Sequence, residues 1–227
     1  METIKINDRL MTAVQFVRKG ARFADIGTDH AYLPIYLLNS GAIKCAIAAD
    51  INQGPLDKAD ENISKYEMSS SIKTVLCDGL SAIPADEVDD IAIFGMGGEL
   101  IVKIIDESPW TKSAQKRLIL QPMTHPEKLR KYLAENGYKI IGEALSLDRG
   151  KLYQTICAEY DGITREFDEF TLLFGEFILR EKSELLISLL ANERKKIVRK
   201  IEGKRSGKED ASYEEVILKS IEKYIER

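Results

Sequence analysis

The alternation of apolar and polar residues divides the chain into a longer mixed part and a shorter helical part. Between residues 21 and 160, short β-type runs alternate with stretches of helical spacing, which is typical of parallel strands joined by crossover helices. The runs predict seven strands, at residues 22–26, 42–50, 72–77, 90–94, 117–121, 138–147 and 152–160. A polar turn, Asp148-Arg149-Gly150-Lys151, separates the last two, so we expect an antiparallel hairpin at the sheet edge.

Helical spacing describes most of the segments that join these strands. It predicts helices at residues 53–66, 98–107 and 126–136, and a short helix at residues 7–19 before the first strand. The sequence Thr124-His125-Pro126-Glu127 resembles a capping box, with proline in the first turn of the helix that follows. The fold class that these patterns predict is α/β.

After residue 160 the pattern is helical throughout. Apolar residues at helical intervals predict one long amphipathic helix over residues 167–201, and the same spacing resumes at residues 213–224 after Ser206-Gly207-Lys208. We expect these helices to fold back on each other as an antiparallel, coiled-coil-like hairpin. The predicted domains are therefore an α/β domain at residues 1–160 and a helical domain at residues 161–227.

Composition narrows the classes of protein that remain. The 227 residues are 44% hydrophobic and 31% charged, with no apolar run of about 18 residues that would span a bilayer and no signal-peptide pattern, so we expect a cytoplasmic protein with no membrane partner. The cysteines lack the C-x-x-C spacing of metal or redox sites, so we expect no metal. A net charge of −4 argues against a protein that binds nucleic acid over its whole surface, but it permits a local basic patch.

Acids and glycines follow four consecutive predicted strands. In open parallel sheets, the ligand crevice lies at the carboxyl ends of the strands, so we expect these residues to meet at one site. They are Asp25 and Gly27 after the first strand, Asp50 and Ile51 after the second, Asp78 and Gly79 after the third, and Gly95 and Met96 after the fourth.

The first of these strand ends favours a cationic cofactor. A dinucleotide site of the G-x-G-x-x-G type would place glycines where this chain has Asp29 and Tyr32, and a carboxylate there would repel pyrophosphate. Asp25 suits hydrogen bonds from turn amides or from a ligand ammonium group, and Gly27 permits a close backbone approach. We therefore expect a cationic sulfonium cofactor and not a dinucleotide.

The other strand ends suit the recognition of an adenosine group. Asp50 can accept hydrogen bonds from both ribose hydroxyls, and Asp78 from the adenine amino group, while Gly79 leaves room for the ring. The loop with Gly95 and Met96 is expected to close over the reaction centre.

Two segments carry a resemblance to a known family. Ala24-Asp25-Ile26-Gly27-Thr28-Asp29-His30-Ala31-Tyr32-Leu33-Pro34 and Gly95-Met96-Gly97-Gly98 resemble the bacterial tRNA (adenine-22-N1)-methyltransferase family, TrmK. The resemblance extends over nearly the whole chain, although Thr28 and Met123 replace the serine and asparagine that are usual there. It implies a Rossmann-like, seven-stranded methyltransferase domain, S-adenosylmethionine as methyl donor, and N1 of an adenine in the D-arm region of tRNA as acceptor.

Methylation at N1 creates positive charge on the adenine ring, which a carboxylate would stabilise. Asp29 is our candidate for this catalytic role, with His30 and Tyr32 as positioning groups. The alternative is that Asp29 caps the following helix and that His30 is an ordinary turn residue.

A basic cluster from Arg194 to Lys208 lies where the helical hairpin is expected to turn. There it would contact tRNA phosphates, and the alternative is a solvated helix face with ion pairs. A basic patch on the first domain would add to this contact, and its candidates are Lys103, Lys112, Lys116, Arg117 and Arg130. We expect a monomer. Competing functions are methyl transfer to a small molecule or protein, and a non-catalytic module that binds an adenosine ligand.

Overall fold

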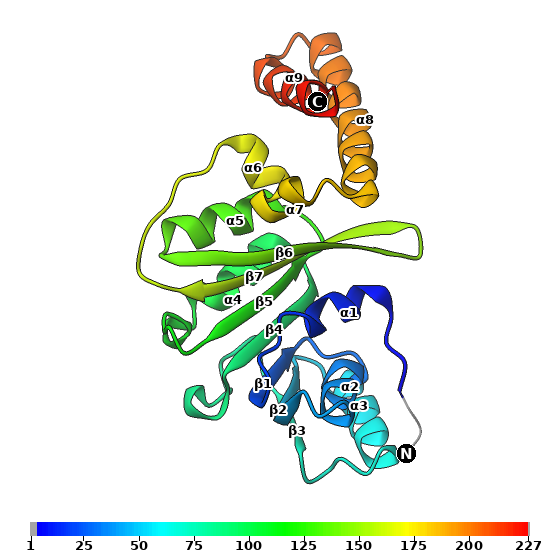
Figure 1. The fold of residues 1–227 in the computed structure, drawn as a ribbon, viewed down its shortest axis with the longest axis vertical. Coiled ribbons are helices and arrows are strands. Elements are labelled where there is room, and N and C mark those ends of the chain that lie inside the picture. Colours follow the sequence, from blue (N-terminus) through cyan, green and yellow to red (C-terminus); the bar gives the residue numbers. More distant parts are fainter. Residues whose placement is uncertain (1–3, 227) are drawn as a thin grey trace. The chain divides into compact units, whose positions relative to one another are not determined.

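Seven strands form one mixed sheet in the computed structural model, which describes residues 4–226 (Figure 1). They are β1 (Ala21–Ile26), β2 (Ile43–Asp50), β3 (Ile72–Leu76), β4 (Asp90–Met96), β5 (Arg117–Pro122), β6 (Tyr138–Asp148) and β7 (Lys151–Tyr160). Their order in the sheet is β3-β2-β1-β4-β5-β7-β6, and only β7 runs antiparallel to its neighbours. The predicted α/β sheet and its closing hairpin are confirmed.

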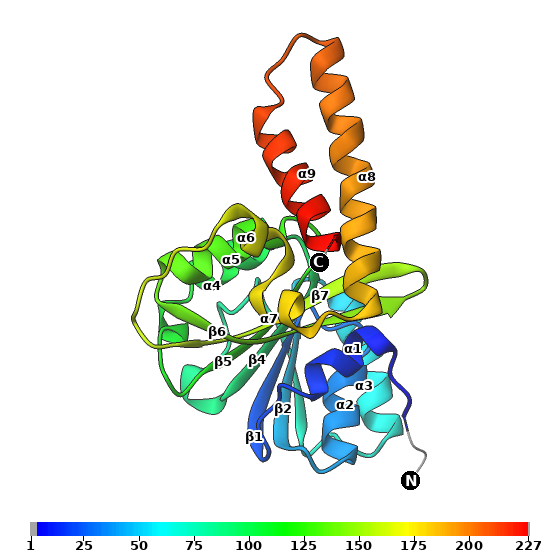
Figure 2. The ribbon, with the colours of Figure 1, turned by 45° about the horizontal axis from the view of Figure 1, so that its top comes forward.

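Helices cover both faces of this sheet (Figure 2). They are α1 (Asp8–Val14), α2 (Tyr32–Asn39), α3 (Gln53–Lys65), α4 (Gly98–Asp106) and α5 (Pro126–Glu135), with short 3₁₀ turns η1 (Ala85–Glu87) and η2 (Pro109–Thr111). Phe23 packs with α1, α2 and α3, whereas its neighbour Ala24 packs with α4 and α5. Alternate residues of each strand thus enter two separate cores, as the two-residue period of a strand requires.

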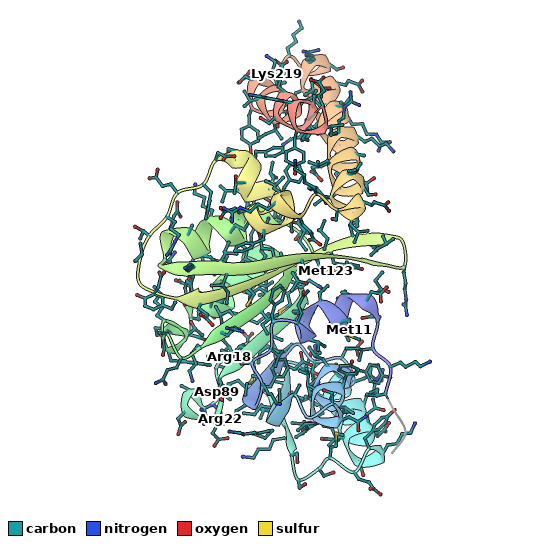
Figure 3. All side chains as sticks on the ribbon, in the orientation of Figure 1. Met11, Arg18, Arg22, Asp89, Met123 and Lys219 are labelled. Atoms are coloured by element: carbon teal, nitrogen blue, oxygen red, sulfur yellow. The ribbon has the colours of Figure 1, made fainter. Side chains whose placement is uncertain are left out.

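Ion pairs fix the amino ends of the strands. Arg18 binds Asp90 and Arg22 binds Asp89, each at 2.6 Å, and Figure 3 shows Arg18, Arg22 and Asp89 close together at that end of the sheet. The backbone amide of Arg18 also donates to Asp90 Oδ2 (2.7 Å). The helix α1 ends at Val14 and not at residue 19 as predicted, because the chain tightens there into turns in which the amides of Phe16 and Val17 donate to Ala13 O and Val14 O.

The start of α5 differs from the predicted capping box. His125 is the N-cap residue, its backbone is left-handed (φ 52°), and no side chain caps the helix. The His125 Nδ1 atom instead lies 3.0 Å from Glu127 Oε1. The capping-box prediction was therefore wrong, because the N-cap position falls on His125, one residue later than a capping box formed by Thr124 and Glu127 requires.

The chain divides into two compact units, the first ending at Glu166 and the second beginning at Phe167. This division lies six residues after the predicted domain boundary at residues 160/161. Residues 161–166 remain with the first unit because the amides of Asp161 and Gly162 donate to Gly137 O, and that of Arg165 to Ala134 O.

The second unit contains α6 (Glu169–Phe174), α7 (Glu176–Glu181), α8 (Glu184–Ser206) and α9 (Ser212–Ile225). The single long helix predicted over residues 167–201 was wrong. Gly175 (φ 84°) and Lys182 (φ 51°) have left-handed backbones that interrupt it, and Ser183 then caps α8. Arg194 binds Glu222 while Arg205 binds Glu215, so α8 and α9 form the expected antiparallel hairpin. Between residues 4 and 226, no helix is long and apolar enough to cross a membrane.

Candidate active site

The carboxyl ends of four parallel strands lie side by side along one edge of the sheet. Asp25 lies in register with Ala48 of β2 and Ala92 of β4, and Asp50 pairs with Leu76 of β3. The strand order reverses between β1 and β4, and ligands of open α/β sheets bind at such a switch point. The structure therefore brings the predicted strand-end residues to a common edge.

Asp25 is a buried carboxyl group at this switch point. Its exposed fraction is 7%, and Thr28 Oγ1 donates to its Oδ2 atom at 2.7 Å. Burial raises its pKa to about 6, although the bond from Thr28 and the positive charge of Arg9 act in the opposite direction. Among the residues described, none donates to Oδ1, so this oxygen is available to a ligand ammonium group.

Gly27 and Gly95 both have positive φ angles and lie near a side chain of another element. Gly27 has φ 73°, and a Cβ atom there would lie 2.4 Å from Met96 Cε. Gly95 has φ 77°, and a Cβ atom there would lie 3.4 Å from Arg9 Nη1. The predicted loops after β1 and β4 therefore meet, with the Met96 side chain directed at Gly27.

The ends of β2 and β3 are more open. The Asp50 Oδ1 atom accepts a hydrogen bond from the Asn52 amide (2.7 Å), Asp78 is exposed, and Ile51 is 59% exposed. Gly79 has φ 54°, and a Cβ atom there would lie 2.9 Å from Ile104 of α4. The missing side chain of Gly79 therefore makes room for α4.

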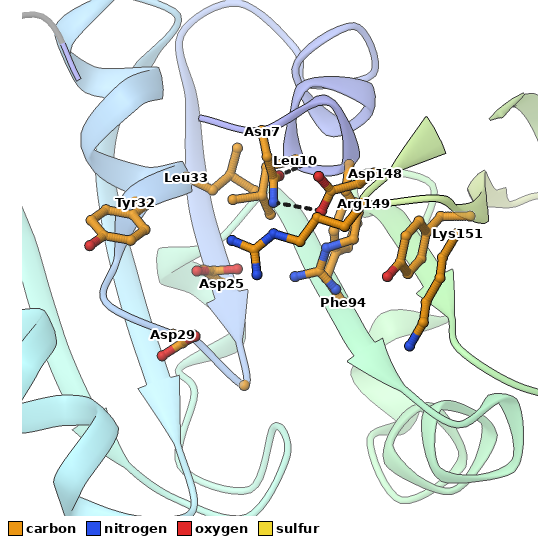
Figure 4. Close-up of a pocket in the computed structure, with 13 residues that line it drawn as sticks. Asn7, Leu10, Asp25, Asp29, Tyr32, Leu33, Phe94, Asp148, Arg149 and Lys151 are labelled. Atoms are coloured by element: carbon orange, nitrogen blue, oxygen red, sulfur yellow. Dashed lines mark hydrogen bonds between the residues drawn. The ribbon is translucent and has the colours of Figure 1, made fainter. Parts of the chain in front are cut away.

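A pocket of about 430 Å³ opens beside the end of β1 (Figure 4). Of the predicted residues, it is lined by Asp25, Gly27, Asp29 and Tyr32. The remaining lining residues come from the N-terminal segment, the end of β4, the start of α2 and the β6–β7 hairpin, and they are Asn7, Arg9, Leu10, Leu33, Phe94, Asp148, Arg149, Lys151 and Tyr153. His30, Asp50, Ile51, Asp78, Gly79, Gly95 and Met96 lie outside this set.

Asp29, His30 and Tyr32 form one connected group. His30 Nε2 lies 3.1 Å from Asp29 Oδ1, and the His30 ring stacks on Tyr32 with centroids 5.2 Å apart. The N-cap of α2 is Ala31, and no side chain caps this helix. The capping alternative for Asp29 is therefore wrong, and its carboxylate is 81% exposed at the pocket.

Sequence reasoning missed the basic wall of this pocket. Figure 4 shows Arg149 and Lys151 across from Asp29, and the guanidinium of Arg9 lies 5.5 Å from the centre of the Tyr153 ring. The sequence pattern places Arg9 only in a short helix and Arg149 only in a turn. The available signal was an arginine in a two-residue hairpin turn, where asparagine or glycine is usual.

The basic patch expected on the first unit does not form. Arg130 is buried against Glu143 (2.7 Å), Lys116 is buried with its ammonium group on backbone carbonyls, and Arg117 binds Glu159 (2.6 Å). Lys103 lies 3.8 Å from Glu107, and Lys112 is exposed. This prediction was wrong because most of these charges serve the fold.

In the second unit, ion pairs occupy part of the predicted basic cluster. Lys200 and Lys204 both bind Glu214 at 2.7 Å, and Arg194, Lys196 and Arg205 also have acidic partners. Lys195, Arg199 and Lys208 are exposed and form no ion pair with any described residue. Three cations of the cluster therefore remain available to an external anion. No group of three His, Cys, Asp or Glu side chains among residues 4–226 is arranged to hold a metal ion.

Strand order and strand-end chemistry define a Rossmann-like methyltransferase. The fold is shared with ribosomal protein L11 methylase from Lactobacillus delbrueckii subsp. bulgaricus, at 20% identity and a TM-score of 0.56 over 67% of this chain and 76% of that one. The family model for tRNA (adenine(22)-N(1))-methyltransferase, TrmK, matches residues 23–226. The chain belongs to this family, which confirms the resemblance found in its motifs.

Relatives of this family resemble the chain over most of its length. The tRNA (adenine(22)-N(1))-methyltransferase of Bacillus subtilis (strain 168) is 35% identical over 85% of this chain and 83% of its own. A putative tRNA (m1A22) methyltransferase of Streptococcus pneumoniae, in complex with S-adenosyl-L-methionine, is 31% identical with a TM-score of 0.87, over 97% of this chain and 99% of that chain. M. capricolum TrmK in complex with S-adenosyl-homocysteine is 28% identical with a TM-score of 0.82, over 97% and 98% of the two chains.

Proposed function

We propose that this protein transfers the methyl group of S-adenosylmethionine to N1 of adenine 22 in tRNA. The observation that carries the proposal is the meeting of four acid- or glycine-bearing strand ends at one edge of the sheet, with a pocket open beside the end of β1, in a chain of the TrmK family. The names of the Bacillus subtilis and Streptococcus pneumoniae relatives support the same reaction.

The strand ends fit the cofactor in chemical terms. The free Oδ1 atom of Asp25 suits the ammonium group of the methionine part, and Asp50 suits the ribose hydroxyls. Asp78 would accept a hydrogen bond from the adenine amino group, and the exposed side chain of Ile51 offers an apolar surface to the ring. Gly27, Gly79, Gly95 and Met96 shape the loops that hold these groups.

The cofactor supplies an electrophilic sulfonium methyl group. Adenine N1 forms the new N–C bond as the C–S bond breaks, so the positive charge moves from sulfur to the adenine ring. The protein therefore has mainly to align the reacting atoms and exclude water. Asp29 would stabilise the cationic ring or accept a proton from its amino group, while His30 holds Asp29 and Tyr32 positions the base.

The two units would have separate roles in catalysis and in tRNA binding. We propose that the first unit, which ends at Glu166, is the catalytic domain and that the second, which begins at Phe167, is a helical domain that contacts tRNA through Lys195, Arg199 and Lys208 of the Arg194 to Lys208 cluster. We further propose that the protein acts as a monomer in the cytoplasm.

The test is methylation of unmodified tRNA transcripts with radiolabelled S-adenosylmethionine, followed by mapping of the modified base. We expect label at adenine 22 and none when that adenine is replaced by guanine. Asp29→Asn should lower kcat by about tenfold to a hundredfold, because a charge that stabilises the transition state is removed. Glu61→Gln, which neutralises an exposed carboxylate on α3, is the matched control.

The outcomes separate the claims. Binding of cofactor without labelling of tRNA would overturn the RNA assignment and leave a small molecule or protein as the acceptor. An unchanged kcat in Asp29→Asn would remove Asp29 from the mechanism while leaving the reaction in place. Lack of methyl transfer to any acceptor would favour a binding module.

A further inference from the structure

Two cations at the mouth of the pocket have no part in the chemistry described above. Arg149 and Lys151 are exposed and line the pocket that also contains Asp25 and Asp29 (Figure 4). Neither forms an ion pair or a side-chain hydrogen bond with any residue from 4 to 226. Arg9 differs, because it lies over the Tyr153 ring and its charge lowers the pKa of Asp25. Arg149 and Lys151 are therefore available to an anionic ligand.

The turn that carries them has a fixed and strained geometry. Asp148 pairs with Lys151 at the end of the β6–β7 ladder, so the turn consists of Arg149 and Gly150 alone. Their φ angles are 47° and 75°, both positive as in a type I′ turn, which favours Asn-Gly. An arginine at the first position is disfavoured by contact between its Cβ atom and the backbone. Strain of this kind is concentrated at functional sites.

Asn7 holds this turn against the N-terminal helix. Its Oδ1 atom accepts from the Leu10 amide (3.0 Å) as the N-cap of α1, and its Nδ2 atom donates to Asp148 Oδ2 (3.1 Å). Asp148 is the carboxylate adjacent to the two cations in the chain, and the bond from Asn7 satisfies one of its oxygens. An approaching anion would therefore meet a turn that is held in place, with its acidic residue already engaged.

We propose that Arg149 and Lys151 bind the phosphodiester groups that flank the target adenine, and so position its base in the pocket. The proposal rests on the function proposed above. A base that reacts at N1 must leave its stack and enter the site, whereas the phosphates on either side remain at the mouth of the pocket. Cations at that mouth would fix the register of the RNA without reading its sequence.

The experiment compares Arg149→Glu/Lys151→Glu with Lys19→Glu/Lys44→Glu in the full chain. Lys19 and Lys44 are exposed, lie before β1 and near the start of β2, and form no ion pair within residues 4–226, so the control makes the same change in net charge away from the site. We expect the first variant to raise Kd and KM for tRNA by about tenfold and to reduce the salt dependence of log Kd by about 1.5, because two phosphate contacts are lost. Its kcat at saturating tRNA and its Kd for S-adenosylmethionine should stay within about twofold of wild type.

A milder variant separates a loss of tRNA binding from a loss of folding. Arg149→Asn places the favoured Asn-Gly pair in the turn, so it should raise Tm while it still raises KM for tRNA. A tRNA with one neutral methylphosphonate linkage beside adenine 22 should bind wild type less tightly, yet bind Arg149→Glu/Lys151→Glu no worse than unmodified tRNA does.

An unchanged KM and salt dependence in Arg149→Glu/Lys151→Glu would overturn this proposal while tRNA methylation by wild type still stood. An equal loss in the control variant would also overturn it, since the effect would then be one of overall charge. Failure of wild type to label adenine 22 would instead overturn the proposed function, and this inference with it.

Discussion

At the scale of single residues, the burial of Asp25 lowers the free energy of unfolding at neutral pH. Burial raises its pKa to about 6, from an ordinary value near 4. Between about pH 4 and pH 6, the folded protein binds a proton that the unfolded chain has released. The contribution of Asp25 to the free energy of unfolding therefore increases as the pH falls through 6. At neutral pH the buried carboxylate costs roughly 2–3 kcal/mol, because each pKa unit corresponds to about 1.4 kcal/mol.

We predict that Asp25→Asn unfolds less readily than wild type at pH 7.5, by about 2 kcal/mol, and that the difference shrinks towards pH 4.5. The amide oxygen can still accept the bond from Thr28. The affinity of Asp25→Asn for S-adenosylmethionine should fall by about tenfold or more, since a charged acceptor for the ammonium group is lost. Urea unfolding at both pH values and calorimetric titration measure the two effects. Equal stability of variant and wild type at pH 7.5 would refute the proposed cost of burial.

At the scale of elements, α1 and the β6–β7 hairpin complete a pocket that begins at the end of β1. One side chain, Asn7, caps α1 and bonds to Asp148 of β6. These two roles use different atoms, so substitutions can separate them. The amide oxygen serves the helix, and the amide nitrogen serves the hairpin.

We predict that Asn7→Ala destabilises the protein by about 1 kcal/mol, which is typical for loss of an N-cap. Asn7→Asp should retain that stability, because the carboxylate still accepts from the Leu10 amide, but it places a second negative charge against Asp148. The turn should loosen in both variants, and KM for tRNA should rise in both. Thermal unfolding and steady-state kinetics test this, and an Asn7→Asp protein with wild-type KM would show that the hairpin needs no such anchor.

At the scale of the whole molecule, the second unit carries cations that its own fold leaves unused. Lys195, Arg199 and Lys208 are exposed without acidic partners in the described part of the chain, whereas Lys200 and Lys204 bind Glu214. The paired cations stabilise the α8–α9 hairpin. The unpaired ones are therefore the better candidates for contact with tRNA.

We predict that Lys195→Glu/Arg199→Glu/Lys208→Glu raises Kd for tRNA by about tenfold and weakens its salt dependence, because phosphate contacts are lost. The matched control replaces Lys182, Lys219 and Lys223 with glutamate. These are exposed cations of the same unit without acidic partners among residues 4–226. Filter binding over a range of salt concentrations measures both variants. A similar loss of tRNA affinity in the two variants would show that tRNA binds elsewhere on the protein.

The sequence alone determined the sheet, its closing hairpin and the line of strand-end residues. Local periodicity encodes strands and helices, and parallel strands bring their carboxyl ends to one edge, so Asp25, Asp50, Asp78 and Gly95 could be placed together without a structure. Breaks in the long helix at Gly175 and Lys182 were missed because the apolar spacing continues across them.

Only the tertiary structure decided which charges face the site. Arg149 is more than a hundred residues from Asp25 in the chain, and it reaches the pocket because β7 lies beside β5 and α1 packs on β6. The burial of Lys116 and Arg130 was equally hidden, since a cation that serves the core and one that serves a ligand look alike in sequence. Local pattern specifies the elements, whereas burial and long-range packing specify what each charged side chain meets.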